Sequence, residues 1–274
     1  MKKLVVVIVT YRRKFTDTPS ADLLLKYARE NQLTLVIYDN EKVTSKITGQ
    51  NVINIQNNSN EGLVKGYNAA LEIAIDKGAQ WLLLLDHDTK LSAEYFDELF
   101  ARLDSKQPVK AMLPTIVSAE VVVSPLESDK YISLRTSQAL QPGKFNGQLM
   151  AINSGSTLSV DILESIGGFN EAFPLDFLDH WLFWRLNQID QPYLILETQL
   201  KHSLSVQTPS AMSTTRYASI LAGEVLYYSQ YNIEEFKNYR KHLLLRSAKQ
   251  FLKFKNRQLW RMSLKTLIQL RRGK

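Results

Sequence analysis

The sequence contains no cysteine, and none of its apolar runs is long enough to span a bilayer. The first absence excludes a disulfide framework and a thiolate metal site. The second argues against a transmembrane helix, which needs about 20 consecutive apolar residues. Internal repeats and low-complexity tracts are also lacking. Because 274 residues with 45% hydrophobic content can bury a sizeable core, we expect a globular protein of the reducing cytoplasm.

Acidic residues are missing from one part of the chain. From Phe236 to Lys274 there are 13 Lys or Arg and no Asp or Glu, so the remainder is net acidic although the whole chain carries +7. A cationic segment on an acidic body suggests contact with an anionic surface. A membrane, a nucleic acid and an acidic partner are the alternatives.

The first half of the chain alternates strand-like and helix-like segments. This pattern predicts an α/β domain with a largely parallel sheet and right-handed crossovers. Strands are expected at 4–10, 33–38, 52–55, 81–85 and 109–113, and helices at 20–31, 63–77 and 92–103.

The second half is less regular. Between 118 and 147, proline and glycine separate short apolar pieces, which predicts loops and an antiparallel excursion. We expect strands at 149–153 and 193–196, and helices at 161–166, 177–188, 212–231 and 234–270. A domain boundary near residue 206 would separate a domain at 1–205 from a basic, amphipathic helical region at 206–274.

Two carboxylates follow the most apolar strand. The run 81–85 leads directly into Asp86-His87-Asp88, so a buried strand presents two aspartates at its carboxyl end, where α/β folds place ligands. Two aspartates separated by one residue can hold Mg²⁺ or Mn²⁺, and the bound cation can in turn bind a diphosphate. The alternative is that both only cap the helix that begins near Ser92.

Seven segments occur in an order that resembles family 2 glycosyltransferases, and most closely the bacterial rhamnosyltransferase-like branch. They are IVTYRR, VIYDN, NNSNEGLVKGYNAAL, WLLLLDHDT, NSGSTLS, IGGFNEAFPLDFLDHWLFWRL and LKH, and they cover about residues 4–205. The resemblance implies the GT-A fold, which is Rossmann-like with a mostly parallel central sheet flanked by helices, here with a C-terminal helical extension. It also implies an inverting hexosyltransferase with a nucleotide-sugar half at about 1–115 and an acceptor half at about 116–205.

The resemblance further implies residue roles at the donor site. Asp39 would accept from the nucleobase, and Asp88 would bind Mn²⁺ or Mg²⁺, with Asp86 contacting the ribose or the metal and His202 lying near the metal or diphosphate. Glycines and the start of a helix would approach the diphosphate, although a turn and a packed helix are the alternative at 60–68. The nucleotide-sugar set is Thr10, Tyr11, Arg12, Asp39, Asn60, Gly62, Gly66, Asn68, Asp86 and His87, with His87 expected to be neutral and partly packed.

On the acceptor side, the resemblance makes Asp179 the general base. An ionised carboxylate can take the proton of the attacking hydroxyl from the side opposite the diphosphate. Asp176 would share a helix face with Asp179, one turn apart. Without the resemblance, Asp179 reads as an N-cap or surface acid. The acceptor-side set is Ser154, Gly155, Asp176, His180, Trp181 and Arg185, and a core position is the alternative for Trp181.

Apolar residues recur at helical intervals among the Lys and Arg of 236–274. We expect peripheral contact of this segment with the anionic inner face of the plasma membrane, with Trp260 at the interface. Packing against the catalytic body or another subunit is left open, and with it a homo-oligomer. Nucleic acid is not the expected partner, because the body is acidic and has no recognisable motif.

The expected function is transfer of rhamnose from dTDP-rhamnose to a cell-surface polysaccharide or lipid-linked glycan precursor. A UDP-glucose or UDP-galactose transferase of the same fold, a non-catalytic scaffold and a basic nucleic-acid-binding protein are the alternatives.

Overall fold

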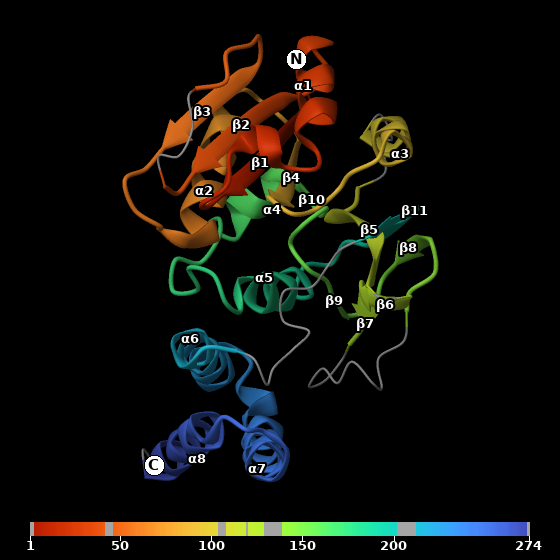
Figure 1. Ribbon diagram of the computed structural model, residues 1–274. Coiled ribbons are helices and arrows are strands. Elements are labelled where there is room, and N and C mark those ends of the chain that lie inside the picture. Colours follow the sequence, from red (N-terminus) through yellow and green to blue (C-terminus); the bar gives the residue numbers. More distant parts are fainter. Residues whose placement is uncertain are drawn as a thin grey trace. The chain divides into compact units, whose positions relative to one another are not determined.

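The computed structural model describes residues 3–41, 46–103, 108–118, 120–128, 139–201 and 212–272. These residues form two compact units, one within 3–201 and one within 212–272 (Figure 1). The predicted boundary at 205/206 lies outside the described residues. In the described part of the chain, no helix is both long and apolar enough to cross a membrane.

The first unit is built on a nine-stranded mixed sheet with the order β3-β2-β1-β4-β10-β5-β11-β8 and β6 beside β5. Its main strands are β1 (Leu4–Thr10), β2 (Thr34–Asp39), β3 (Val52–Gln56), β4 (Trp81–Asp86), β5 (Ala111–Ser118) and β11 (Tyr193–Lys201). The antiparallel strands are β6 (Val121–Ser124), β8 (Gly143–Phe145) and β10 (Thr157–Ser159), while β7 (Leu126–Glu127) and β9 (Leu149–Met150) pair separately. The predicted halves meet inside β5, so they share one sheet.

Helices cover both faces of this sheet, which confirms the predicted fold class. The short η1 (Phe15–Asp17), α1 (Ala21–Arg29) and α3 (Ala93–Leu103) share a core with one set of alternating strand residues. On the other face lie α2 (Gly62–Asp76) and α4 (Val160–Ser165), and α5 (Leu178–Leu186) packs near β9. Because strands covered on both sides need no polar face, β1 and β2 are buried at every residue.

Strand β10 was not predicted. It contributes three residues, which lie antiparallel between β4 and β5 in the middle of the sheet. Gly155 precedes it with φ +85, a left-handed conformation that favours glycine, and its N–H donates to Leu84 O at 2.8 Å. A strand this short has no detectable periodicity, because period-2 alternation needs several residues to show.

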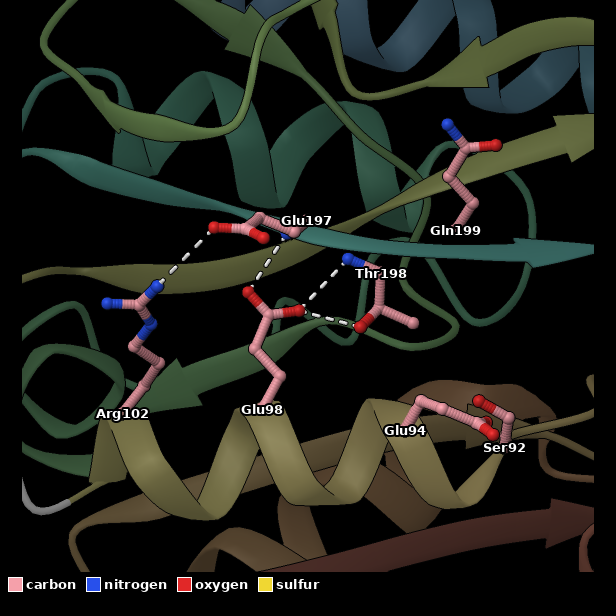
Figure 2. A pocket seen from close by; sticks show the side chains of 7 residues that line it. All are labelled: Ser92, Glu94, Glu98, Arg102, Glu197, Thr198 and Gln199. Carbon is pink, nitrogen blue, oxygen red and sulfur yellow. Dashed lines mark hydrogen bonds and ion pairs between the residues drawn. The ribbon is translucent and has the colours of Figure 1, made fainter.

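The pairing of β11 with β5 shifts register between Ile195 and Gln199. Glu98, on α3, reaches this irregularity across a surface pocket (Figure 2). Its carboxylate accepts from the N–H groups of Glu197 and Thr198, each at 2.9 Å. The register shift leaves these two N–H groups without a partner in the neighbouring strand, and the Glu98 carboxylate accepts from both. This explains why a glutamate faces the sheet here.

The second unit is helical. It comprises α6 (Thr214–Leu226), a π-turn η3 (Tyr227–Tyr231), a 3₁₀ turn η4 (Ile233–Glu235), α7 (Phe236–Lys253) and α8 (Arg257–Arg272). The prediction of one helix at 234–270 was wrong, because Phe254 is extended (φ −99, ψ 135). Asn256 Oδ1 then accepts from Gln258 N at 3.0 Å, as a residue capping a new helix does.

Buried polar side chains hold these helices together. Arg246 Nη1 on α7 donates to Glu224 Oε1 on α6 at 2.7 Å, and its Nη2 donates to the other oxygen. A second network joins three helices: Ser263 Oγ donates to Gln250 Oε1 at 2.9 Å, and Gln250 Nε2 donates to Tyr217 Oη at 2.8 Å. Each of these bonds satisfies a group that would otherwise be costly to bury.

Candidate active site

The carboxyl ends of the central strands lie side by side. In the strand register, Val9 pairs with Asp86, Thr10 with Asp39, and Asp39 with Gln56. Polar residues therefore gather at one edge of the sheet, at the ends of β4, β1, β2 and β3. This edge is the usual ligand crevice of an α/β sheet.

A buried serine braces the turn that carries the paired aspartates. Asp86 N–H donates to Ser154 Oγ at 2.9 Å, and the hydroxyls of Thr89 and Ser154 lie 2.7 Å apart in a hydrogen bond. Ser154 and Gly155 are both buried, so the expectation that they face an acceptor does not hold. Ser154 instead supports the turn, and Gly155 redirects the chain into β10.

Asp86 is a strongly perturbed carboxyl group, with its pKa raised to about 7. Burial is the largest cause, and the negative charge of Asp88 adds to it. Tyr67 Oη donates to Asp86 Oδ1 at 3.2 Å and acts in the opposite direction, while the charge of Asp179 raises the pKa further. Like charges are thus concentrated here, a pattern that is frequent at functional sites.

The charge of Asp179 acts on the residues around the paired aspartates. Its charge raises the pKa of Tyr67 as well as that of Asp86. The pKa of Tyr67 lies well above its ordinary value, mainly because of burial and next because of Asp86, so its hydroxyl stays protonated as a donor. Residues from α2, the end of β4 and α5 therefore converge on one site.

Tyr67 is the site residue that the sequence analysis missed. It lies between Gly66 and Asn68, two residues that were singled out, and it is completely buried. Its spacing from Ala70 and Ala74 places it on the apolar face of α2 that packs on the sheet. That spacing was the available signal, but it predicts a core residue equally well.

Asp179 is the second residue of α5. Its Oδ1 accepts from His180 N–H at 2.9 Å and lies 3.0 Å from His180 Nδ1. The ring of His180 stacks on Phe177, with centroids 4.3 Å apart. Asp179 and His180 are both partly exposed, so either can touch a ligand.

Other predictions for this segment are revised. Asp176 precedes α5, and Phe177 between them has φ +67, so Asp176 and Asp179 do not share a helix face. Trp181 is only 6% exposed and belongs to the core rather than to an acceptor surface. Arg185 Nη1, near the end of α5, donates to Gln188 Oε1 at 2.8 Å.

The first turn of α2 is occupied by partners from the protein. Gly62 N–H donates to Asn60 Oδ1 at 3.0 Å, while the N–H groups of Leu63 and Val64 donate to Pro174 O at 2.7 and 3.4 Å. A Cβ on Gly62 would lie 2.1 Å from the same carbonyl. The expected diphosphate contact at this helix start is therefore not supported, because its donors are already used.

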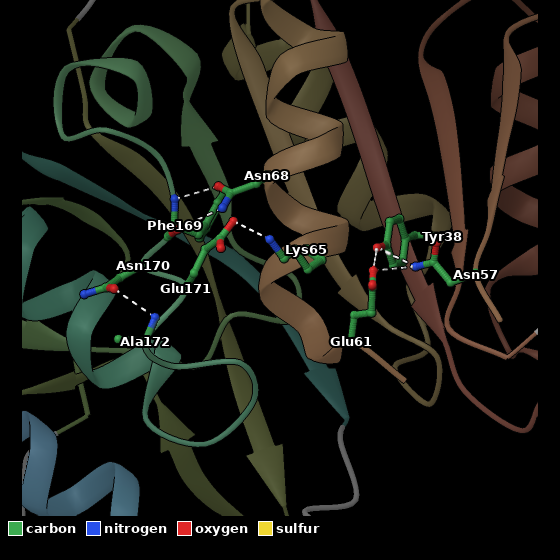
Figure 3. A network of polar contacts seen from close by, with 9 residues as sticks. All are labelled: Tyr38, Asn57, Glu61, Lys65, Asn68, Phe169, Asn170, Glu171 and Ala172. Atoms are coloured by element: carbon green, nitrogen blue, oxygen red, sulfur yellow. Dashed lines mark hydrogen bonds and ion pairs between the residues drawn. The ribbon is translucent and has the colours of Figure 1, made fainter. Parts of the chain in front are cut away.

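Further along α2, the expected nucleotide contacts are also packing contacts. Asn68 Nδ2 donates to Phe169 O at 2.9 Å, and its Oδ1 accepts from Phe169 N–H at 2.8 Å (Figure 3). Lys65 pairs with Glu171 at 2.7 Å. A Cβ on Gly66 would lie 2.8 Å from Val9 Cγ2. The alternative of a packed helix is the better description of 60–68.

The turns after β1 and β2 offer fewer exposed groups than expected. Thr10 and Asp39 are almost wholly buried, and Asp39 Oδ1 accepts from Glu41 N–H at 3.2 Å. Contact of Asp39 with a nucleobase therefore requires this turn to open. Tyr11 and Arg12 are more accessible, with the guanidinium carbon of Arg12 5.0 Å from the centre of the Tyr11 ring.

The histidine between the paired aspartates has a lowered pKa, which favours its neutral form. Burial is the main cause that lowers the pKa of His87; the charge of Asp88 opposes this shift and that of Arg13 reinforces it. Arg13 also donates to His87 O at 3.3 Å, which attaches the turn after β1 to the turn after β4.

The carboxylates at this edge suit a hard cation that shares its ligands with a substrate. Asp86 and Asp88 supply oxygen donors, the type that Mg²⁺ and Mn²⁺ prefer, and His202 lies outside the described residues. No group of three or more His, Asp or Glu in the described ranges is arranged to hold a metal ion. Because Mg²⁺ is usually bound by one or two carboxylates plus substrate phosphates, the two aspartates fit such a site.

Comparison with known proteins finds similar sequences and structures. No protein-family model matches the chain. The dTDP-rhamnosyl transferase RfbF of Shigella flexneri is 23% identical over 206 residues, which cover 72% of this chain and 68% of RfbF. The crystal structure of S. aureus TarS 1-349 has a TM-score of 0.56 and 14% identity, and covers 98% of this chain and 80% of that one.

The same S. aureus TarS 1-349 in complex with UDP-GlcNAc matches with a TM-score of 0.56 and 16% identity, over 98% of this chain and 81% of that one. At these identities the structures establish the fold, which is GT-A. In its ordered motifs, its fold and its match to the rhamnosyl transferase, the chain resembles the family 2 glycosyltransferases of the GT-A fold, and its sequence is rhamnosyltransferase-like.

Proposed function

We propose that the protein is an inverting, metal-dependent glycosyltransferase that moves one sugar from a nucleoside diphosphate to an acceptor hydroxyl. The observation that carries the proposal is the electrostatic coupling of Asp179 to Asp86 across the site, with Asp88 beside Asp86. In the proposed mechanism, the carboxylate of α5 and the two at the end of β4 act on opposite sides of a single sugar. This is the arrangement that single-displacement transfer requires.

Asp179 is the proposed general base. As the acceptor oxygen forms its bond to the anomeric carbon, Asp179 accepts the hydroxyl proton, and the bond to the diphosphate breaks with its electron pair leaving on the phosphate oxygen. His180, hydrogen-bonded to Asp179 Oδ1, restricts the orientation of that carboxylate. Exposure of both side chains allows the acceptor to approach them.

Asp88, with Asp86, is the proposed holder of Mn²⁺ or Mg²⁺. When bound, such a cation offsets the negative charge that develops on the departing diphosphate. Tyr67 supports this role from inside the protein, because its hydrogen bond favours the ionised form of Asp86. Ser154 keeps the backbone of the turn in place.

The proposed donor is dTDP-rhamnose. It is supported by the rhamnosyl transferase relative, whose match spans most of the first unit. UDP-sugars are the alternative donors, because the similar TarS structure was determined with UDP-GlcNAc. The proposed acceptor is a cell-surface polysaccharide or lipid-linked glycan precursor at the cytoplasmic side of the membrane.

Release of nucleoside diphosphate from a donor panel tests the proposal. Purified protein is incubated with dTDP-rhamnose, UDP-glucose, UDP-galactose or UDP-GlcNAc, with Mn²⁺ or with a chelator. We expect slow, metal-dependent hydrolysis of dTDP-rhamnose, abolished by Asp88→Ala and retained by Asp76→Asn, which changes an exposed acid at the end of α2. Hydrolysis that survives both chelation and Asp88→Ala would contradict the proposed metal role, and faster hydrolysis of a UDP-sugar would reassign the donor.

A further inference from the structure

One face of α7 exposes four large apolar side chains. Leu245 and Leu252 are 56% and 77% exposed, and Leu244 and Phe251 are also among the exposed large hydrophobic residues. Leu244 and Phe251 are seven residues or about two turns apart, as are Leu245 and Leu252, and the two pairs lie side by side, so the four residues form one broad stripe of the helix. An exposed apolar cluster on an ordered helix indicates an interaction surface.

The stripe is not needed by the fold of the helical unit. The buried residues of α7 are Tyr239, Leu243, Ser247 and Gln250, which lie on the opposite side of the helix. Ser247 and Gln250 there contact α8 and α6 through Trp260 O and Tyr217 Oη. Selection for folding alone therefore does not account for leucine at 245 and 252.

Cationic side chains surround the stripe. Lys241 and Lys249 are exposed on the same side of α7, and the guanidinium carbon of Arg257 lies 5.3 Å from the centre of the Phe251 ring. There is no Asp or Glu anywhere from Phe236 to Lys274. The α7 outer face, defined as Lys241, Leu244, Leu245, Lys249, Phe251 and Leu252, is thus apolar at its centre and positive at its margin.

We propose that the α7 outer face binds the surface of an anionic membrane. The leucines and Phe251 enter the boundary between head groups and acyl chains, and the lysines reach the lipid phosphates, with the helix lying in the plane of the surface. Trp260, the residue expected at the interface, packs edge-on against Phe251 with centroids 5.2 Å apart. It therefore packs against one residue of the face.

The charges of this face disfavour other occupants. A symmetric dimer packed through this face would bring the positive margins of the two copies together, and like charges across an interface are repulsive. A nucleic acid would satisfy the lysines but would leave Leu252 against a polar backbone. A lipid surface provides both an apolar layer and phosphates.

Vesicle flotation of the full chain tests this surface. The paired substitution Leu245→Gln with Leu252→Gln is expected to reduce binding to vesicles of phosphatidylcholine and phosphatidylglycerol by about tenfold or more, since two apolar anchors are lost. Val121→Gln, at a residue 61% exposed in the first unit, is the matched control and leaves binding unchanged. Equal binding by the paired variant and the control overturns the proposal.

A charge variant gives an independent measurement. Lys241→Gln with Lys249→Gln is expected to weaken binding to the same vesicles by about fivefold for each lysine, and to have little effect on the weaker binding to phosphatidylcholine alone. If the Leu245→Gln, Leu252→Gln variant loses a dimer in light scattering while its vesicle binding stays intact, the proposal is overturned in favour of a self-association surface. Because the readout is lipid binding, it is independent of whether the proposed sugar transfer is correct.

Discussion

The two units of the protein hold desolvated acidic side chains in opposite electrostatic surroundings. In the first unit, Asp86 is desolvated and is subject to the negative charges of Asp88 and Asp179, which help to raise its pKa to about 7. In the second unit, Glu224 is buried against both terminal nitrogens of Arg246. One carboxylate is therefore surrounded by charges of its own sign, and the other is neutralised within the protein.

This difference separates a site that requires a ligand from one that stabilises the fold. Crowded carboxylates cost folding free energy and are retained where they act on something outside the chain. A paired carboxylate such as Glu224 needs no external partner. Substitution should consequently change catalysis in the first case and the free energy of unfolding in the second.

The largest expected effect is on catalysis. Asp179→Asn keeps the shape of the side chain but removes the proposed base, so kcat should fall by about 10³-fold, within the range for general base catalysis. Donor affinity, measured by calorimetry, should be almost unchanged. Asp76→Asn is the control, and a kcat within twofold of the wild type for Asp179→Asn would exclude the assigned role.

The next effect is on the stability of the helical unit. Arg246→Ala leaves Glu224 buried without a cation, and we expect the free energy of unfolding to fall by about 3 kcal/mol. Urea denaturation followed by circular dichroism measures it. Arg261→Ala, on the exposed side of α8, should cost no more than about 0.5 kcal/mol. Equal losses in the two variants would show that the ion pair has no special structural role.

Lys110 tests whether every buried charge of the first unit belongs to the site. It is buried before β5, where Nζ donates to Ile189 O at 3.0 Å and lies 4.1 Å from the centre of the Tyr193 ring. Burial lowers the pKa of Lys110 to about 8, and the charge of Asp190 opposes the shift. The amine of Lys110 thus has a carbonyl group and an aromatic ring as partners, away from the sheet edge that carries Asp86.

The folded pKa of Lys110 lies below the unfolded value, so the unfolded state binds the proton more tightly. The free-energy cost of burying the protonated amine is therefore complete below pH 8. The free energy of unfolding should rise between pH 8 and 10.5 by about 2 kcal/mol. Urea midpoints across this range measure the rise. Lys110→Met should flatten it without changing kcat, and an unaltered pH dependence in that variant would assign the effect to other groups.

The smallest expected effect concerns Tyr67. Tyr67→Phe removes the donor that favours ionised Asp86, so the Asp86 pKa should rise and the acid limb of the activity profile should move to higher pH. Metal affinity near pH 7 should fall by about tenfold, as when a residue supporting a metal ligand is lost. Tyr95→Phe removes another buried hydroxyl, which donates to Gly155 O, and should leave the pH profile in place. Identical profiles for both variants would contradict the role of Tyr67.

Strand ends and the paired aspartates were predictable because both depend on local pattern. The apolar run 81–85 is long, buried and followed at once by Asp86, so its position in a parallel sheet could be inferred from sequence. The sheet register then brings Thr10 and Asp39 to the same edge. The proximity of Asp179 to this edge came from the family resemblance, since no local rule relates α5 to β4.

The remaining errors arose where tertiary contacts decide. The turn that contains Ser154 has the composition of an exposed turn, but it is buried beneath Asp86. Gly66 and Asn68 suggest close ligand approach, yet the close approach is to Val9 and the Phe169 backbone. Tyr67, on the apolar face of α2, looked like any core residue. Sequence patterns report what a residue can do, and packing determines which of those options is used.

The attachment of Pro174 to the start of α2 has a consequence for engineering. Leu63 and Val64 bind the carbonyl of the segment that leads to Asp179, and Asn68 holds Phe169 in that segment. A chimaera that exchanges only 167–177 with a homologous loop would lose matched contacts with α2, and the position of Asp179, the proposed general base, would change. Grafts aimed at new acceptor selectivity should therefore transplant both pieces together.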